Sequence, residues 1–131
     1  MEYLIDTNII SELAKKEPDP SVAKWASSIK KCSLSVISIE EIFYGLAWRP
    51  NKRIQEWMVT FIDNYINVLD VTYTISRRAG ALRGEFQSKG TVRTQADILI
   101  AATAIEHNLT LVTRNVRDFE ECNAALLNPF S

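Results

Sequence analysis

Short apolar runs alternate with amphipathic segments along the whole chain. An apolar run between polar turn residues predicts a buried strand, whereas apolar residues every three or four positions predict a helix. The predicted strands are residues 3–5, 32–37, 68–71, 109–113 and 124–127. The predicted helices are residues 6–13, 21–29, 38–46, 54–62, 75–89 and 94–106, with a short helical turn over 115–121. This alternation predicts an α/β fold of three layers, with helices on both faces of a mostly parallel sheet.

The segment 94–106 differs from the other predicted helices because it is apolar almost all round. A helix of this kind is expected in the centre of a domain. Gly90 ends the mixed helix before it, as glycine commonly does at helix C-termini. The chain has no internal repeat, low-complexity tract or linker, so residues 1–131 are expected to form a single domain.

The composition says more about the cellular location of the protein than about its function. Apolar residues make up 47% of the chain and charged residues 24%, which is ordinary for a globular protein. The net charge of -1 shows no basic excess, so it neither supports nor excludes an RNA partner. Cys32 and Cys122 are far apart without CxxC spacing, so reduced thiols are expected. Because the chain carries no signal-peptide pattern and no apolar stretch of membrane length, we expect a cytoplasmic protein with no membrane contact.

Four acidic residues stand directly after predicted strands or near the starts of predicted helices. Asp6 follows the strand at 3–5. The other three each lie three residues after a Ser, Thr or Asn: Glu41, Asp97 and Asp118. That spacing is a capping box or a close variant, in which the acid accepts a hydrogen bond from a free backbone N–H at a helix start. Taken singly, these three acids are explained as helix caps, and Asp6 is equally explained as a turn residue.

The positions of the same acids in the predicted fold favour a second interpretation. The C-termini of parallel strands open at one edge of a sheet, so Asp6, Glu41 and Asp118 are expected to converge there. Asp97 heads the most buried helix, where a charge has little access to water. Acids gathered in one place raise one another's pKa values unless a cation lies among them.

Oxygen ligands without His or Cys suit Mg²⁺ or Mn²⁺. Capping and metal binding are compatible, because the helix dipole keeps an acid at a helix start ionised. His107 is the only histidine, so the chain has no second histidine for a zinc pair or a histidine-based dyad. The chain also lacks the motifs GxxxxGK(S/T), GxGxxG and GxSxG. Metal-assisted phosphoester hydrolysis is the chemistry that remains.

Four stretches of the chain carry motifs in a recognisable order. They are LIDTNIISEL at 4–13, SVISIEEIFYG at 35–45, ADILIAATAIEHNLTLVTRNVRDFE at 96–120 and LLNPF at 126–130. In this order they resemble the PIN-domain ribonucleases, and most closely the VapC-like toxins of bacterial type II toxin–antitoxin modules. A lone DTN is a weak signal, whereas the ordered set spans nearly the whole chain. The region 50–90 carries few marks of the family.

The resemblance implies roles for the four acids. Asp6 matches the acid that ends the first strand, and Glu41 matches an E-(L/I)-x-x-G pattern that Gly45 completes. Asp97 matches an AD-x-x-IAA-x-A pattern, and Asp118 matches a TRN-x-x-DF pattern. By this resemblance Asp6, Glu41 and Asp97 hold a metal ion directly or through water. Asp118 acts through water or a second ion.

The resemblance and the sequence together place four further polar residues around these acids. Thr113 and Asn115 are accessory polar groups in the family's pattern, whereas Glu40 does not fit the pattern and is expected to face solvent. Arg114 and Arg117 lie close to the acids in sequence, so they are candidates for holding RNA phosphates, with surface salt bridges as the alternative.

The function implied by the resemblance is that of a Mg²⁺- or Mn²⁺-dependent endoribonuclease whose cognate antitoxin covers the site. It also implies a homodimer, for which apolar stripes with Trp25 or Trp57 are candidates unless they belong to the core. DNA would be reached only through the antitoxin.

Two alternatives stand beside this function. One is a metal-dependent phosphohydrolase with a substrate other than RNA; Asn8 occupies the place where the haloacid-dehalogenase type needs a second aspartate. The other is a non-catalytic RNA- or protein-binding scaffold, which an incomplete set of acids would favour. The set here is complete.

Overall fold

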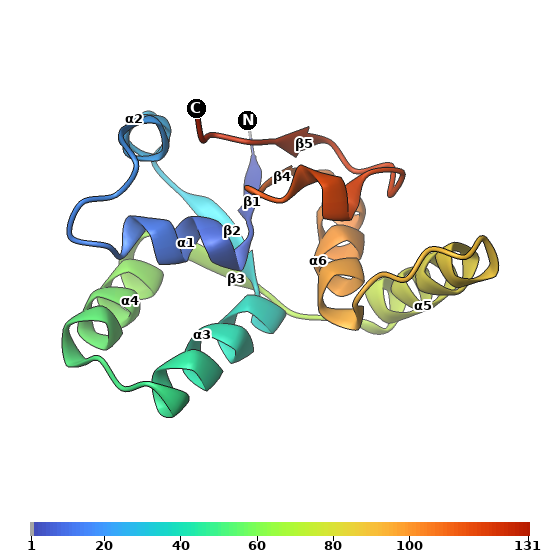
Figure 1. The fold of residues 1–131 in the computed structure, drawn as a ribbon, viewed down its shortest axis with the longest axis horizontal. Helices are drawn as coiled ribbons and strands as arrows, with labels where there is room; N and C mark the ends of the chain where they lie inside the picture. The colour runs from blue at the N-terminus through green and yellow to red at the C-terminus, as the bar shows by residue number, and fades with distance from the viewer. Residues whose placement is uncertain (1) are drawn as a thin grey trace.

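Five parallel strands form the centre of the computed structural model, which describes residues 2–131 (Figure 1). Their order across the sheet is β3-β2-β1-β4-β5, and each neighbouring pair runs parallel. The strands are β1 (Tyr3–Ile5), β2 (Cys32–Ser35), β3 (Ile66–Leu69), β4 (Thr110–Val112) and β5 (Leu126–Leu127). The α/β prediction is therefore confirmed.

Helices cover both faces of this sheet. They are α1 (Thr7–Leu13), α2 (Pro20–Ser27), α3 (Val36–Trp48), α4 (Lys52–Tyr65), α5 (Tyr73–Ser88), α6 (Gln95–Glu106) and the 3-10 helix η1 (Val116–Phe119). Neighbouring residues of a strand point to opposite faces. Leu4 of β1 accordingly packs in the core under α5, α6 and η1, and Ile5 packs in the core under α1 to α4. No helix within residues 2–131 is long and apolar enough to cross a membrane.

The helix predicted to be central is the most buried one. Six residues of α6 are buried, among them Ile98, Ile100 and Ala102. The side chain of Thr94 caps α6 by accepting a hydrogen bond from the backbone N–H of Asp97 (3.1 Å). Helix α5 ends as predicted, and Gly90 beyond it has a φ of 80°, which a residue with a side chain rarely adopts.

The boundary between β2 and α3 differs from the prediction. The strand predicted over 32–37 ends at Ser35, whose hydroxyl accepts a hydrogen bond from the backbone N–H of Ile37 (3.0 Å) and so caps α3. Val36 and Ile37 are apolar and β-branched, which favours a strand locally, yet they form the first turn of the helix. Ser38 therefore lies inside α3 and does not cap it.

The tryptophans divide between the core and the surface. Trp25 packs edge-on against Tyr3, with 5.4 Å between ring centroids, and Trp57 stacks on Phe61 at 4.7 Å. Both pack against the core beneath α1 to α4. Trp48 on α3 is 66% exposed. The stripes that carry Trp25 and Trp57 thus contribute to the core.

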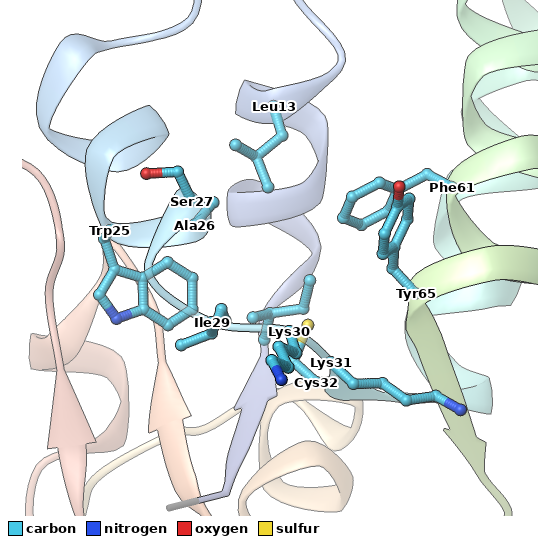
Figure 2. Close-up of a pocket in the computed structure, with 11 residues that line it drawn as sticks. Leu13, Trp25, Ala26, Ser27, Ile29, Lys30, Lys31, Cys32, Phe61 and Tyr65 are labelled. Atoms are coloured by element: carbon cyan, nitrogen blue, oxygen red, sulfur yellow. The ribbon is translucent and has the colours of Figure 1, made fainter.

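An apolar cavity of about 320 Å³ lies between α1, α2, α4 and the start of β2 (Figure 2). Trp25 of α2 and Phe61 of α4 lie on opposite sides of it in Figure 2, with Lys30 and Lys31 near the start of β2. None of the four candidate acids lines this cavity. It is therefore separate from the carboxylate chemistry.

Two serines at the β2–α3 boundary, Ser35 and Ser38, allow a matched test of where α3 begins. Both are fully buried; Ser35 caps the helix, whereas the hydroxyl of Ser38 has no hydrogen-bond partner among the described residues. Ser35→Ala should lower the free energy of unfolding by about 1 kcal/mol, because the first turn loses its acceptor. Ser38→Ala should leave it unchanged or raise it, because a buried unpaired hydroxyl is removed. Urea unfolding of the two variants measures this, and equal losses would contradict it.

Candidate active site at the carboxyl edge of the sheet

Asp6 connects the ends of two adjacent strands. Its backbone N–H donates to the carbonyl oxygen of Val112 in β4 (2.8 Å). Its carboxylate accepts hydrogen bonds from the hydroxyl of Thr113 (2.8 Å) and from the backbone N–H of Thr7 (2.8 Å). The side-chain amide of Asn8 donates a further bond to it (3.1 Å). Asp6 is only 6% exposed, so these bonds fix its carboxylate in a nearly buried position.

The loop after β4 is held against the same residues. The side-chain oxygen of Asn8 accepts from the backbone N–H of Arg114 (3.1 Å), and the hydroxyl of Thr113 accepts from the backbone N–H of Asn115 (3.0 Å). Asn8 therefore bridges Asp6 and this loop. That role of Asn8 was not predicted from the sequence, where its signal is an amide side chain two residues after a strand-ending acid.

Glu41 approaches Asp6 from the second turn of α3. The hydroxyl of Thr7 donates to one of its carboxylate oxygens at 2.6 Å, which links α3 to the first turn of α1. Because Ser35 caps α3, the prediction that Ser38 and Glu41 form a capping box is wrong. Glu41 is half-buried, and its neighbour Glu40 is exposed, as predicted.

Asp97 and Asp118 approach the edge from the other side of the sheet. Asp97 is the third residue of α6 and is half-buried. Asp118 lies exposed on η1, where its backbone N–H donates to the carbonyl oxygen of Asn115 (3.0 Å). The side chain of Asn115 makes no capping bond, so the capping variant predicted for Asp118 is also wrong.

The pKa values of Asp97 and Asp6 are raised by burial and by neighbouring acids. Burial is the main cause that raises the pKa of Asp97, and repulsion from Asp6, Asp118 and Glu41 raises it further, while the Thr94 hydroxyl lowers it. Burial also raises the pKa of Asp6, with a smaller contribution from Glu41; hydrogen bonds from Thr113, Thr7 and Asn8 oppose the shift. Burial and the neighbouring carboxylates therefore disfavour the charged forms of Asp97 and Asp6.

The donor chemistry of this edge fits a hard divalent cation. The groups there are carboxylate, hydroxyl and amide oxygens, and His107 lies at the opposite end of α6. Such oxygens suit Mg²⁺ or Mn²⁺. Within residues 2–131, however, no three Asp, Glu, His or Cys side chains lie close enough to hold one ion as they stand. One oxygen of Asp6 is bonded to the Thr113 hydroxyl, and one oxygen of Glu41 is bonded to the Thr7 hydroxyl.

Comparison with known proteins identifies the family of this chain. A family model described as the PIN domain matches residues 3–124. The chain belongs to the PIN-domain family. This PIN domain is 33% identical to the VapC ribonuclease Y4jK of Sinorhizobium fredii, over 97% of this chain and 96% of that protein. It is 30% identical to ribonuclease VapC2 of Rickettsia felis, over 92% and 91% of the two chains.

A solved structure matches the fold of this PIN domain over almost its full length. It is VapBC2 from Rickettsia felis bound to a DNA fragment from its promoter, with a TM-score of 0.86 at 28% identity, covering 98% of each chain. The chain is therefore a VapC-type PIN protein in both sequence and fold.

The raised pKa values predict how stability depends on pH in the absence of metal. An acid whose folded-state pKa lies above its unfolded value stabilises the folded state at low pH, and this contribution is lost as pH rises through the raised value. In chelator, the free energy of unfolding of the parent should therefore fall relative to that of Asp97→Asn as the pH rises above 3.8, the ordinary pKa of an aspartate. Near neutral pH the variant should be as stable as the parent or more stable. Urea unfolding across this range measures the difference.

Glu40→Gln is the matched control, because it removes an exposed acid from the neighbouring helix α3. Its stability difference from the parent should change little over the same range. If Asp97 acted only as a helix cap, Asp97→Asn would instead lose about 0.5–1 kcal/mol at neutral pH.

Proposed function

We propose that this VapC-type PIN protein is a Mg²⁺- or Mn²⁺-dependent endoribonuclease that acts as the toxin of a type II toxin–antitoxin system. The observation that carries the proposal is the group of four acids at one sheet edge, where Asp6, Glu41 and Asp118 all raise the pKa of Asp97. Full-length similarity to VapC ribonucleases supports it. A non-catalytic scaffold would not need this repulsive group of carboxylates.

In this proposal Asp6, Glu41 and Asp97 hold the ion directly or through water, and Asp118 acts through water or a second ion. The ion, when bound, polarises the scissile phosphate and lowers the pKa of its water. The protein's part is to position the carboxylates. Thr113 and Asn8 fix Asp6, and Thr7 holds one oxygen of Glu41.

The partners follow from the relatives. The Rickettsia felis structure contains VapBC2 bound to a DNA fragment from its promoter. We infer by analogy that a cognate antitoxin binds this chain, that DNA is reached through that antitoxin, and that the pair works in the cytoplasm. A homodimer stays a prediction, and the exposed aromatic residues Tyr44 and Trp48 of α3 are better candidates for its contacts than Trp25 or Trp57.

The activity is tested with purified protein and a mixed RNA substrate. The parent should cut RNA with Mg²⁺ or Mn²⁺ and stop when chelator is added. Asp6→Asn keeps the shape of the side chain but removes its charge, so the rate should fall by about a hundredfold or more. Glu40→Gln should cut at the parent's rate. Cleavage that continues in excess chelator, or an Asp6→Asn rate equal to the parent's, would contradict the proposal.

A further inference from the structure

A wide cavity of about 690 Å³ lies beside the loop that follows β4. It is lined by Arg114 and Phe130, together with Glu12, Lys15 and residues 17–20. Through Arg114 the cavity adjoins the candidate active site, because the backbone N–H of Arg114 donates to Asn8, whose amide donates to Asp6. None of the four candidate acids lines the cavity, and Asn8 lies between Arg114 and Asp6.

Arg114 and Phe130 form a stacked pair at this cavity. The guanidinium carbon of Arg114 lies 4.6 Å from the centroid of the Phe130 ring, which is the geometry of a cation–π contact. Hydrogen bonds position both residues: Asn8 holds the backbone of Arg114, and the side chain of Asn128 accepts from the backbone N–H of Phe130 (2.9 Å). Phe130 also packs against the core beneath α1 to α4. The pair thus places a positive charge over an aromatic ring at the wall of the cavity.

The charges around the cavity leave Arg114 available to an anion. Glu12 is held by Lys15 (2.8 Å) and by the backbone N–H of Asp19 (2.8 Å). Asp19 itself caps α2. Within residues 2–131 the side-chain ion pairs are Lys15–Glu12 and Arg78–Glu106, so the Arg114 guanidinium forms no ion pair there. Its positive charge nevertheless contributes to the lowered pKa of Glu12, and Glu17 also lines the cavity. The guanidinium of Arg114 is exposed and can donate to a phosphate.

We propose that Arg114 and Phe130 form a subsite for one unpaired nucleotide of the RNA substrate, whose base stacks on this pair and whose phosphate binds Arg114. A planar guanidinium can both stack on a ring and donate two hydrogen bonds to a phosphate. Bases within a duplex are covered by their neighbours, so only a single-stranded nucleotide can use such a surface. The subsite rests on the proposed function, and it predicts that unpaired RNA is the preferred substrate.

The test measures equilibrium binding, separately from cleavage. Fluorescence anisotropy of a labelled single-stranded RNA is recorded with Asp6→Asn protein in chelator, so the RNA stays intact. Phe130→Leu keeps an apolar side chain for the core but removes the ring, and it should weaken binding about tenfold. Phe130→Trp should bind at least as tightly as the parent. A hairpin RNA of the same length and base composition should bind more weakly than the single strand. Phe130→Leu should change the affinity for the hairpin little.

Salt dependence separates the two halves of the subsite. Arg114→Gln removes a phosphate contact, so the slope of log affinity against log salt should become shallower by about 0.7. Phe130→Leu should weaken binding without changing that slope. Tyr73→Ala is the matched control. Tyr73 is 76% exposed, and the guanidinium carbon of Arg77 lies 5.8 Å from the centroid of its ring. Tyr73 follows β3, the outer strand on the opposite side of the sheet from β5. The variant should bind RNA as the parent does.

The outcomes distinguish the subsite from the activity. If the parent cuts RNA but Phe130→Leu binds single-stranded RNA with unchanged affinity, the subsite is wrong and the proposed function stands. The same holds if Phe130→Leu keeps its RNA affinity but escapes inhibition by the antitoxin, which would assign the pair to a protein contact. If the parent neither binds nor cuts RNA, the proposed function itself fails. Thermal melts of Phe130→Leu and Phe130→Trp confirm that both variants are folded.

Discussion

The hydrogen bond from the Thr113 hydroxyl to the Asp6 carboxylate, 2.8 Å long, joins the ends of two adjacent parallel strands. The rest of the site depends on this junction. In a parallel sheet a helix that follows a strand begins at this edge, and so does a helix such as α6 that leads away from it to the start of the next strand, β4. Glu41 on α3 and Asp97 on α6 are therefore brought to Asp6 by topology alone. Asp118 reaches the same edge from η1, which follows β4.

This arrangement opposes the stability of the folded chain. Burial and repulsion raise the pKa of Asp97, and burial raises that of Asp6, so charging either group at neutral pH works against folding. Two apolar cores, one on each face of the sheet, offset this cost. A cation bound among the carboxylates would reverse the effect by favouring their charged forms. Function and stability are thus linked through the same few side chains.

Most of the fold could be predicted from the sequence, because apolar periodicity reports burial directly. The apolar character of α6 placed it in the centre, and the alternation of elements predicted a parallel sheet with helices on both faces. The β2–α3 boundary was predicted wrongly because Val36 and Ile37 suit a strand as well as a helix, and only the Ser35 cap decides between them. The contacts that Asn8 and Phe130 make could not be predicted, because each joins the residue to Arg114 in the distant loop after β4.

The central claim is that the acids at this edge form one site for a divalent cation. Thermal melts with and without Mn²⁺ at neutral pH test it most directly. An ion that binds only the folded state should raise the melting temperature of the parent. At an ion concentration a hundred times the dissociation constant, the free energy of unfolding rises by about 2.7 kcal/mol. Glu40→Gln should gain as much as the parent, and Asp6→Asn should gain much less. An equal gain in all three proteins, or no gain in the parent, would contradict the claim.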